Sequence, residues 1–169
     1  MTDIALYHYY ANEHPNGVQA QTYIKPMSPG KPTRSQADQL VAARKVIASL
    51  VVWRSESSHS WRLEARALSV DPRAVFALRG YIGRANYSFA LLYENYPIRK
   101  CTKHLKHRIG DRILRVPHKH VWDDDSEDHD AHIPSDIDPD SDINDQFLAF
   151  CSECNIDLIG GYQRVLCEV

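Results

Sequence analysis

The chain has 169 residues, 43% of them apolar, which suits one domain with a real core rather than two domains. Its longest apolar run, residues 47–53, is far too short to span a membrane, and no secretory pattern opens the N-terminus. We therefore expect a cytoplasmic protein with no membrane partner, whose four cysteines stay reduced.

The net charge of −2 conceals a strong division of charge along the chain. Residues 42–120 hold 16 Lys or Arg against five Asp or Glu, whereas residues 121–169 hold 14 acids and one arginine. A polyanion such as nucleic acid is one expected partner of the basic part. The alternative is that the acidic part folds back and neutralises the basic part within the same molecule.

Prolines and glycines predict that residues 1–33 are mostly loop. Residues 34–120 are predicted to form a helix followed by a basic β-meander. Ser35 is a candidate N-cap of that helix, and an apolar stripe extends the helix to about Val52. Alternating apolar and polar residues between turn signals then predict four strands: Trp61–Val70, Ala74–Ile82, Tyr87–Glu94 and Ile98–His104.

The last part of the chain is predicted to contain an acidic loop, residues 121–145, and then a closing helix and tail, residues 146–169. Ser141 or Asp142 can cap that helix, and a last strand is expected from Tyr162. The whole of 1–169 is taken as one domain. Its predicted fold class is α+β, with a twisted antiparallel β-sheet of four to six strands and two main helices packed on one face.

Basic residues fall at alternating positions of the predicted strands, so they are expected to share the sheet face that the helices leave open. Such a face is a plausible platform for a phosphate backbone, although single arginines on a sheet are ordinarily solubilising. The candidate nucleic-acid-binding residues are Arg62, Arg66, Arg79, Arg99 and Lys103.

The sharpest local pattern is Pro117-His-Lys-His120. In an extended segment, residues two apart lie on the same side, so His118 and His120 are expected to point together. Two imidazoles can act as acid and base in phosphodiester cleavage, with a cation such as Arg115 stabilising the transition state. His107, part of the same cluster of histidines, is a further catalytic candidate.

A metal-dependent reaction is an open alternative, with a divalent ion (Mg, Mn or Zn) as the cofactor. His118, His120 and Asp123 are the candidate ligands. Cys151 and Cys154 form a single CxxC on the apolar face of the closing helix, where core cysteine is the favoured interpretation. A mixed site of these two thiols and the two imidazoles is the other metal hypothesis.

The stretch from residue 78 to 156 also carries a family resemblance. Its landmarks are Arg79-Gly-Tyr-Ile-Gly-Arg-Ala-Asn86, Pro97-Ile-Arg99, His107, Pro117-His-Lys-His120 and Cys154-Asn-Ile156. The stretch resembles uncharacterised prokaryotic proteins with a Pro-His-x-His element, which are similar in turn to TumE-like toxins of toxin–antitoxin systems. The resemblance implies an active-site role for His118 and His120 and an antitoxin as partner.

Three functions follow as hypotheses. The first is a nucleic-acid-facing toxin or phage-defence protein, in its specific form an endoribonuclease acting on RNA through the His-x-His pair. The second is a non-enzymatic interaction protein: an antitoxin-like partner, an accessory subunit of a defence complex, or a phage-encoded anti-CRISPR inhibitor. The third is a structural-zinc module that uses the two imidazoles and two thiols.

Overall fold

The computed structural model describes residues 30–103, 107–109, 112–114, 116–123, 130–138 and 140–166. This part of the chain forms a nine-stranded sheet in the order β10–β9–β6–β5–β4–β3–β1–β11, with β2 as a further partner of β3. The strands are β1 (Lys45–Val46), β2 (Arg54–Ser57), β3 (Ser60–Val70), β4 (Arg73–Ile82), β5 (Tyr87–Tyr93), β6 (Tyr96–Lys103), β9 (His118–Val121), β10 (Asp130–His132) and β11 (Ile156–Asp157).

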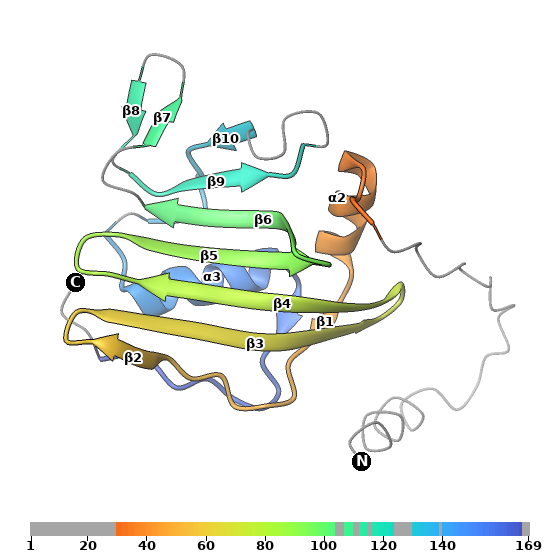
Figure 1. The fold of residues 1–169 in the computed structure, drawn as a ribbon, viewed down its shortest axis with the longest axis horizontal. Coiled ribbons are helices and arrows are strands. Elements are labelled where there is room, and N and C mark those ends of the chain that lie inside the picture. The colour runs from red at the N-terminus through yellow and green to blue at the C-terminus, as the bar shows by residue number, and fades with distance from the viewer. Residues whose placement is uncertain are drawn as a thin grey trace, which may run out of the picture.

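Two helices, α2 (Arg34–Ala42) and α3 (Ile143–Glu153), accompany the sheet, and β7 (His107–Ile109) with β8 (Arg112–Leu114) forms a separate two-stranded sheet. Figure 1 shows α3 behind the sheet, so that the opposite sheet face is turned toward the viewer. All strand pairs in the large sheet are antiparallel except β1 with β11. The predicted α+β class is confirmed, as a mixed and mostly antiparallel sheet with two helices.

Strict alternation of side chains produces the core. On β3, Leu63 and Ala67 are buried, whereas Arg62, Glu64 and Arg66 are exposed. The buried face packs against α3, where the ring of Phe89 on β5 meets Phe147 and Phe150 at centroid distances of 5.4 and 6.0 Å. We call the face toward the helices the covered face and the other the open face.

The predicted count of four to six strands is wrong. The four long strands of the meander lie where the alternation placed them, to within a few residues at each end. The five other strands of this sheet, β1, β2, β9, β10 and β11, are only two to four residues long. Such segments are too short to show a period of two, so only pairing with neighbours defines them.

The first helix is also shorter than predicted. It is capped by Thr33, whose side chain accepts from the Gln36 backbone N–H, and it ends at Ala42 rather than near Val52. Beyond it, Ile47 N donates to Asp157 O at 2.9 Å, and Val51 N donates to Gly161 O at 3.0 Å. The β-branched residues that follow the helix therefore satisfy their backbone by pairing with the end of the chain, which a local pattern does not reveal.

The closing helix was correctly predicted, with Asp142 as its N-cap, but the strand expected from Tyr162 is wrong in the part described. The backbone of Val165 is bound by a side chain instead. Asn144 Oδ1 accepts from Val165 N at 2.8 Å, and Asn144 Nδ2 donates to Val165 O at 3.1 Å. The side-chain amide of the buried Asn144 thus makes the two backbone hydrogen bonds with Val165 that a neighbouring strand would otherwise make.

Lys45 joins the ends of both helices. Its side chain is completely buried, and its Nζ donates to Val41 O, Ala43 O and Cys154 O at 2.9, 2.5 and 2.8 Å. These carbonyls lie at the C-terminal ends of α2 and α3, where helices leave acceptors without intrahelical donors. Burial lowers the pKa of Lys45 to about 8.

We expect Lys45→Met to lower the free energy of unfolding at pH 7 by about 1–3 kcal/mol, because buried carbonyls lose their donor. Because the folded-state pKa of about 8 lies below the ordinary value of 10.5, the unfolded chain binds more protons between these values. The stability advantage of the wild type over Lys45→Met should therefore grow as the pH rises through that window. Urea unfolding at several pH values measures this, with the half-buried Lys103→Met as control; a constant difference would contradict it.

Candidate functional site

Strand β9 carries the two candidate histidines on the open face. His118 is paired with Thr102 of β6, and His120 with Lys100. The imidazole centroids of His118 and His120 lie 5.0 Å apart, edge to face. The expectation that the two rings point together therefore holds, and the backbone alternation of β9 is its cause.

Both imidazoles are nevertheless enclosed. His118 is fully buried, and 5% of His120 is exposed. The ring of His118 has a partner at each nitrogen: Nδ1 lies 3.0 Å from Val116 O, and Nε2 lies 3.1 Å from Thr102 Oγ1. Nδ1 donates to the carbonyl oxygen, which only accepts, whereas Nε2 and the Thr102 hydroxyl share a hydrogen bond in which either atom can be the donor. Such a ring holds β9 beside β6 and offers no nitrogen to a substrate.

The other candidates for catalysis and metal binding are His107, Arg115 and Asp123. The side chain of His107 and the whole of Arg115 lie outside the described residues. Asp123 follows the end of β9, and among the described residues no three His, Cys, Asp or Glu side chains converge as metal ligands. Trp122 turns into the core, where its Nε1 donates to Pro32 O at 2.8 Å.

The two thiols of the CxxC lie on the other side of the sheet from the imidazoles. Cys151 and Cys154 are buried in the core cluster beneath the covered face, whereas His118 and His120 project from the open face. Burial raises the pKa of Cys151 to about 12 and also raises that of Cys154, which disfavours the thiolates that a metal requires. The arrangement matches core cysteines and separates the four proposed zinc ligands.

A charge cluster lies on the covered face between β6, β9 and the helices. Lys119, 3% exposed, is 2.6 Å from Asp136 Oδ2 and 2.7 Å from Glu153 Oε2. Arg99 Nε lies 3.4 Å from Glu153 Oε1, and an Arg99 amino group lies 3.8 Å from Asp38 Oδ1 of α2. Hydrogen bonds and charge from Asp136 and Glu153 raise the pKa of Lys119 despite the opposing effect of desolvation, which is the largest single influence.

The placement of two predicted open-face residues is thereby corrected. Arg99 pairs in register with Leu91, and Lys103 pairs with Tyr87, so both belong to rows of the covered face. Arg99 and Lys100 are consecutive in β6, so one cation lies on each face. On the partner strand β5, the register shifts between Leu91, which pairs with Arg99, and Leu92. Which of these two residues lies on the open face depends on the strand pairing, and the sequence alone does not supply that pairing.

The open face gathers positive charge over β2, β3, β4 and β6. Arg62, Arg66 and Arg79 are exposed there as expected, and the register adds three cations that the sequence analysis did not select. These are Arg54, Arg73 and Lys100. Arg73 could have been selected from the sequence, because it lies an even number of positions from Arg79 on the same strand and both must share a face. Two carboxylates share the face: Glu56 lies 2.6 Å from Arg62 Nε, and Glu64 lies 3.2 Å from Arg79 Nε.

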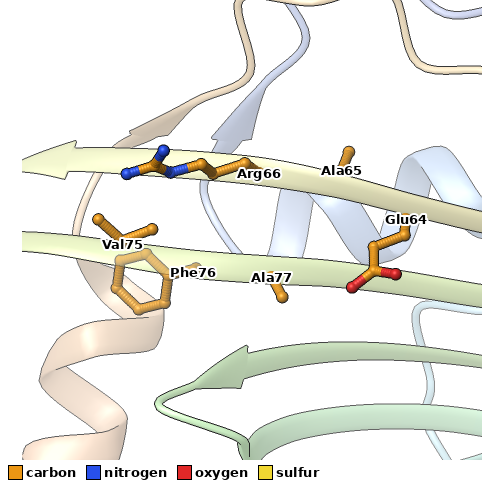
Figure 2. Close-up of a pocket in the computed structure, with 6 residues that line it drawn as sticks. All are labelled: Glu64, Ala65, Arg66, Val75, Phe76 and Ala77. Atoms are coloured by element: carbon orange, nitrogen blue, oxygen red, sulfur yellow. The ribbon is translucent and has the colours of Figure 1, made fainter.

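A shallow depression of about 280 Å³ lies on β3 and β4 within this face. Figure 2 shows Arg66 lying along β3 and Glu64 reaching toward β4, with Val75 and Ala77 on the neighbouring strand. Within the described part of the chain, neither Arg66 nor Arg73 forms an ion pair with a carboxylate. These two guanidinium groups therefore remain available to an anion from solution.

Part of the acidic last third pairs with cations elsewhere in the chain. Asp136 and Glu153 pair with Lys119 and Arg99 on the covered face, and Asp157 lies 2.8 Å from Arg44 Nε. These pairs agree with the explanation by internal neutralisation.

Asp157 belongs to an open-face row, because it pairs in register with Val46, which pairs with Leu68. Among the described residues, the open-face rows therefore carry six cations against three carboxylates, the two above and Asp157 on the edge strand β11. A polyanion partner of this face stays a prediction.

We expect the Thr102–His118 hydrogen bond to contribute to stability as a coupled pair. Thr102→Val and His118→Phe should each destabilise the protein, while the double variant should lose about 1 kcal/mol less than the sum, because the second change breaks no further bond. Urea unfolding of the four proteins gives this coupling energy. Strictly additive losses would show that the two side chains do not interact.

Comparison with protein families, with curated proteins and with solved structures found no match to this chain. No helix in the described ranges is both long and apolar enough to cross a membrane. Any assignment of function must consequently be argued from the arrangement of the chain's own residues.

Proposed function

We propose that the protein binds nucleic acid, and RNA in particular, through the open face of its sheet. The observation that carries the proposal is that the described open-face rows hold six cations against three carboxylates, on a protein whose net charge is −2. RNA is chosen because a His-x-His pair beside a basic sheet is the pattern that led the sequence analysis to an RNA-acting protein. Phosphate groups are the anions that such a set neutralises most effectively, with release of counterions.

Arg66 and Arg73 are the residues proposed to contact phosphates first. Both are exposed, and neither has a carboxylate partner among the described residues. Arg62 and Arg79 are already paired with Glu56 and Glu64, so their charge is partly compensated. An exposed pair of this kind is weak, and a phosphate competes readily for either arginine.

Cleavage of RNA by the histidine pair is a second hypothesis that the geometry supports less well. The centroid distance of 5.0 Å between the rings is compatible with joint action. Burial of His118 and the occupation of both its ring nitrogens oppose such action, because an acid or base must reach the proton that it transfers.

For binding, we expect the double variant Arg66→Gln, Arg73→Gln to weaken RNA affinity and to lower the slope of log K against log salt by about 2. Fluorescence anisotropy of a labelled RNA across a salt series measures both quantities. Arg164→Gln, which removes an exposed guanidinium paired with Asp142 and Asp145 at the start of α3 on the covered side, is the matched control. An unchanged salt slope in the double variant would refute the proposed contact.

For cleavage, we expect labelled RNA to be recovered intact after incubation with the wild-type protein. If the wild type does cleave RNA, His120→Gln tests the pair, since His120 retains some exposure. Cleavage that disappears in this variant, while its melting temperature stays unchanged, would establish the ribonuclease hypothesis over simple binding.

A further inference from the structure

Tyr81, near the end of β4, presents its phenol ring on the open face. Its register partners are Arg62 on β3 and Ser88 on β5. The Arg62 guanidinium lies over the ring, with its central carbon 5.6 Å from the ring centroid. A planar cation and a phenol ring therefore form one stacked unit on the surface.

The ring of Tyr81 lies close to the backbone rather than standing away from it. A Cβ added at Gly83 would come within 2.8 Å of the Tyr81 hydroxyl and 3.2 Å of a ring carbon. The absence of a side chain at Gly83 is therefore what allows the phenol to lie along the strand end.

Small side chains lie beside this unit on β5, where the open-face positions next to it are Ser88 and Ala90. On β4 itself the next open-face residue is Arg79, which is paired with Glu64. From Tyr81 to Arg73, β4 spans roughly 27 Å at 3.4 Å per residue. The Arg62–Tyr81 unit thus lies toward one end of this span and Arg73 toward the other, with Arg66 between them.

Arg62 is held in place by Glu56, at 2.6 Å from its Nε. This ion pair compensates the charge of Arg62 but is made at the edge of the guanidinium, so it does not cover the planar face. Nucleic-acid bases stack on such guanidinium planes as they do on aromatic rings. Arg62 is accordingly better suited to stacking than to phosphate binding, while Arg66 and Arg73 have the opposite character.

We infer that the open face selects single-stranded over duplex RNA, stacking an unpaired base on the Arg62–Tyr81 unit while Arg66 and Arg73 hold phosphates. A duplex keeps its bases stacked on one another and presents mainly backbone to a flat protein surface, so only the arginines would contribute to duplex binding. The inference rests on the proposed function and adds the substrate class and the residue that distinguishes it.

The experiment compares a short labelled RNA strand with the duplex formed from it, by fluorescence anisotropy. We expect Tyr81→Leu to weaken binding of the single strand by roughly 5- to 150-fold, the range for loss of one base-stacking contact, and to leave duplex binding unchanged. Tyr81→Phe keeps the ring and should retain single-strand affinity. Because stacking involves no counterion release, Tyr81→Leu should also keep the salt slope of the wild type.

The outcomes separate the two proposals. If the wild type binds strand and duplex equally and Tyr81→Leu has no effect, the inference is overturned and the proposed function stands. If the wild type binds no RNA even at low salt, the proposed function fails and the inference fails with it. Thermal melting of each variant verifies the fold, and a loss of affinity in Tyr81→Phe equal to that in Tyr81→Leu would also count against stacking.

Discussion

The arrangement of the helices depends on one buried ammonium group. Lys45 brings a positive charge to the carbonyl ends of α2 and α3 at once, and its Nζ also lies 5.1 Å from the centroid of the Phe76 ring on the covered face. Each helix ends in acceptors that need donors, and water does not reach this position. One side chain therefore fixes both helices on the same side, and this leaves the opposite sheet face open.

That division of the sheet into two sides also divides the charge. On the covered face, Glu153 of α3 lies between Arg99 and Lys119 and pairs with both. On the open face, the described rows hold six cations and only three carboxylates. The net charge of the protein thus says little about the surface that a partner would meet, because the two sides of the sheet differ in charge.

Long elements were predictable and short ones were not. The strands β3 to β6 and the helix α3 have enough residues for their periods to show, whereas Lys45–Val46 and Ile156–Asp157 are strands only through pairing across the whole chain. For the candidate site, alternation correctly placed His118 beside His120. Their burial, and the choice of Lys100 over Arg99 for the open face, depend on neighbouring strands, so local pattern could not supply them.

The alternation of His118, Lys119 and His120 has a consequence for how β9 finds its place. A slip of one residue against β6 would move the ammonium group of Lys119 away from Glu153 and Asp136, and would drive two imidazoles toward the aromatic interior. Such a slip would leave the Lys119 ammonium group buried without a carboxylate partner, which costs free energy. In a four-residue strand with little apolar surface, these electrostatic penalties act together with the hydrogen bonds of His118 and the burial of Trp122 to favour one alignment.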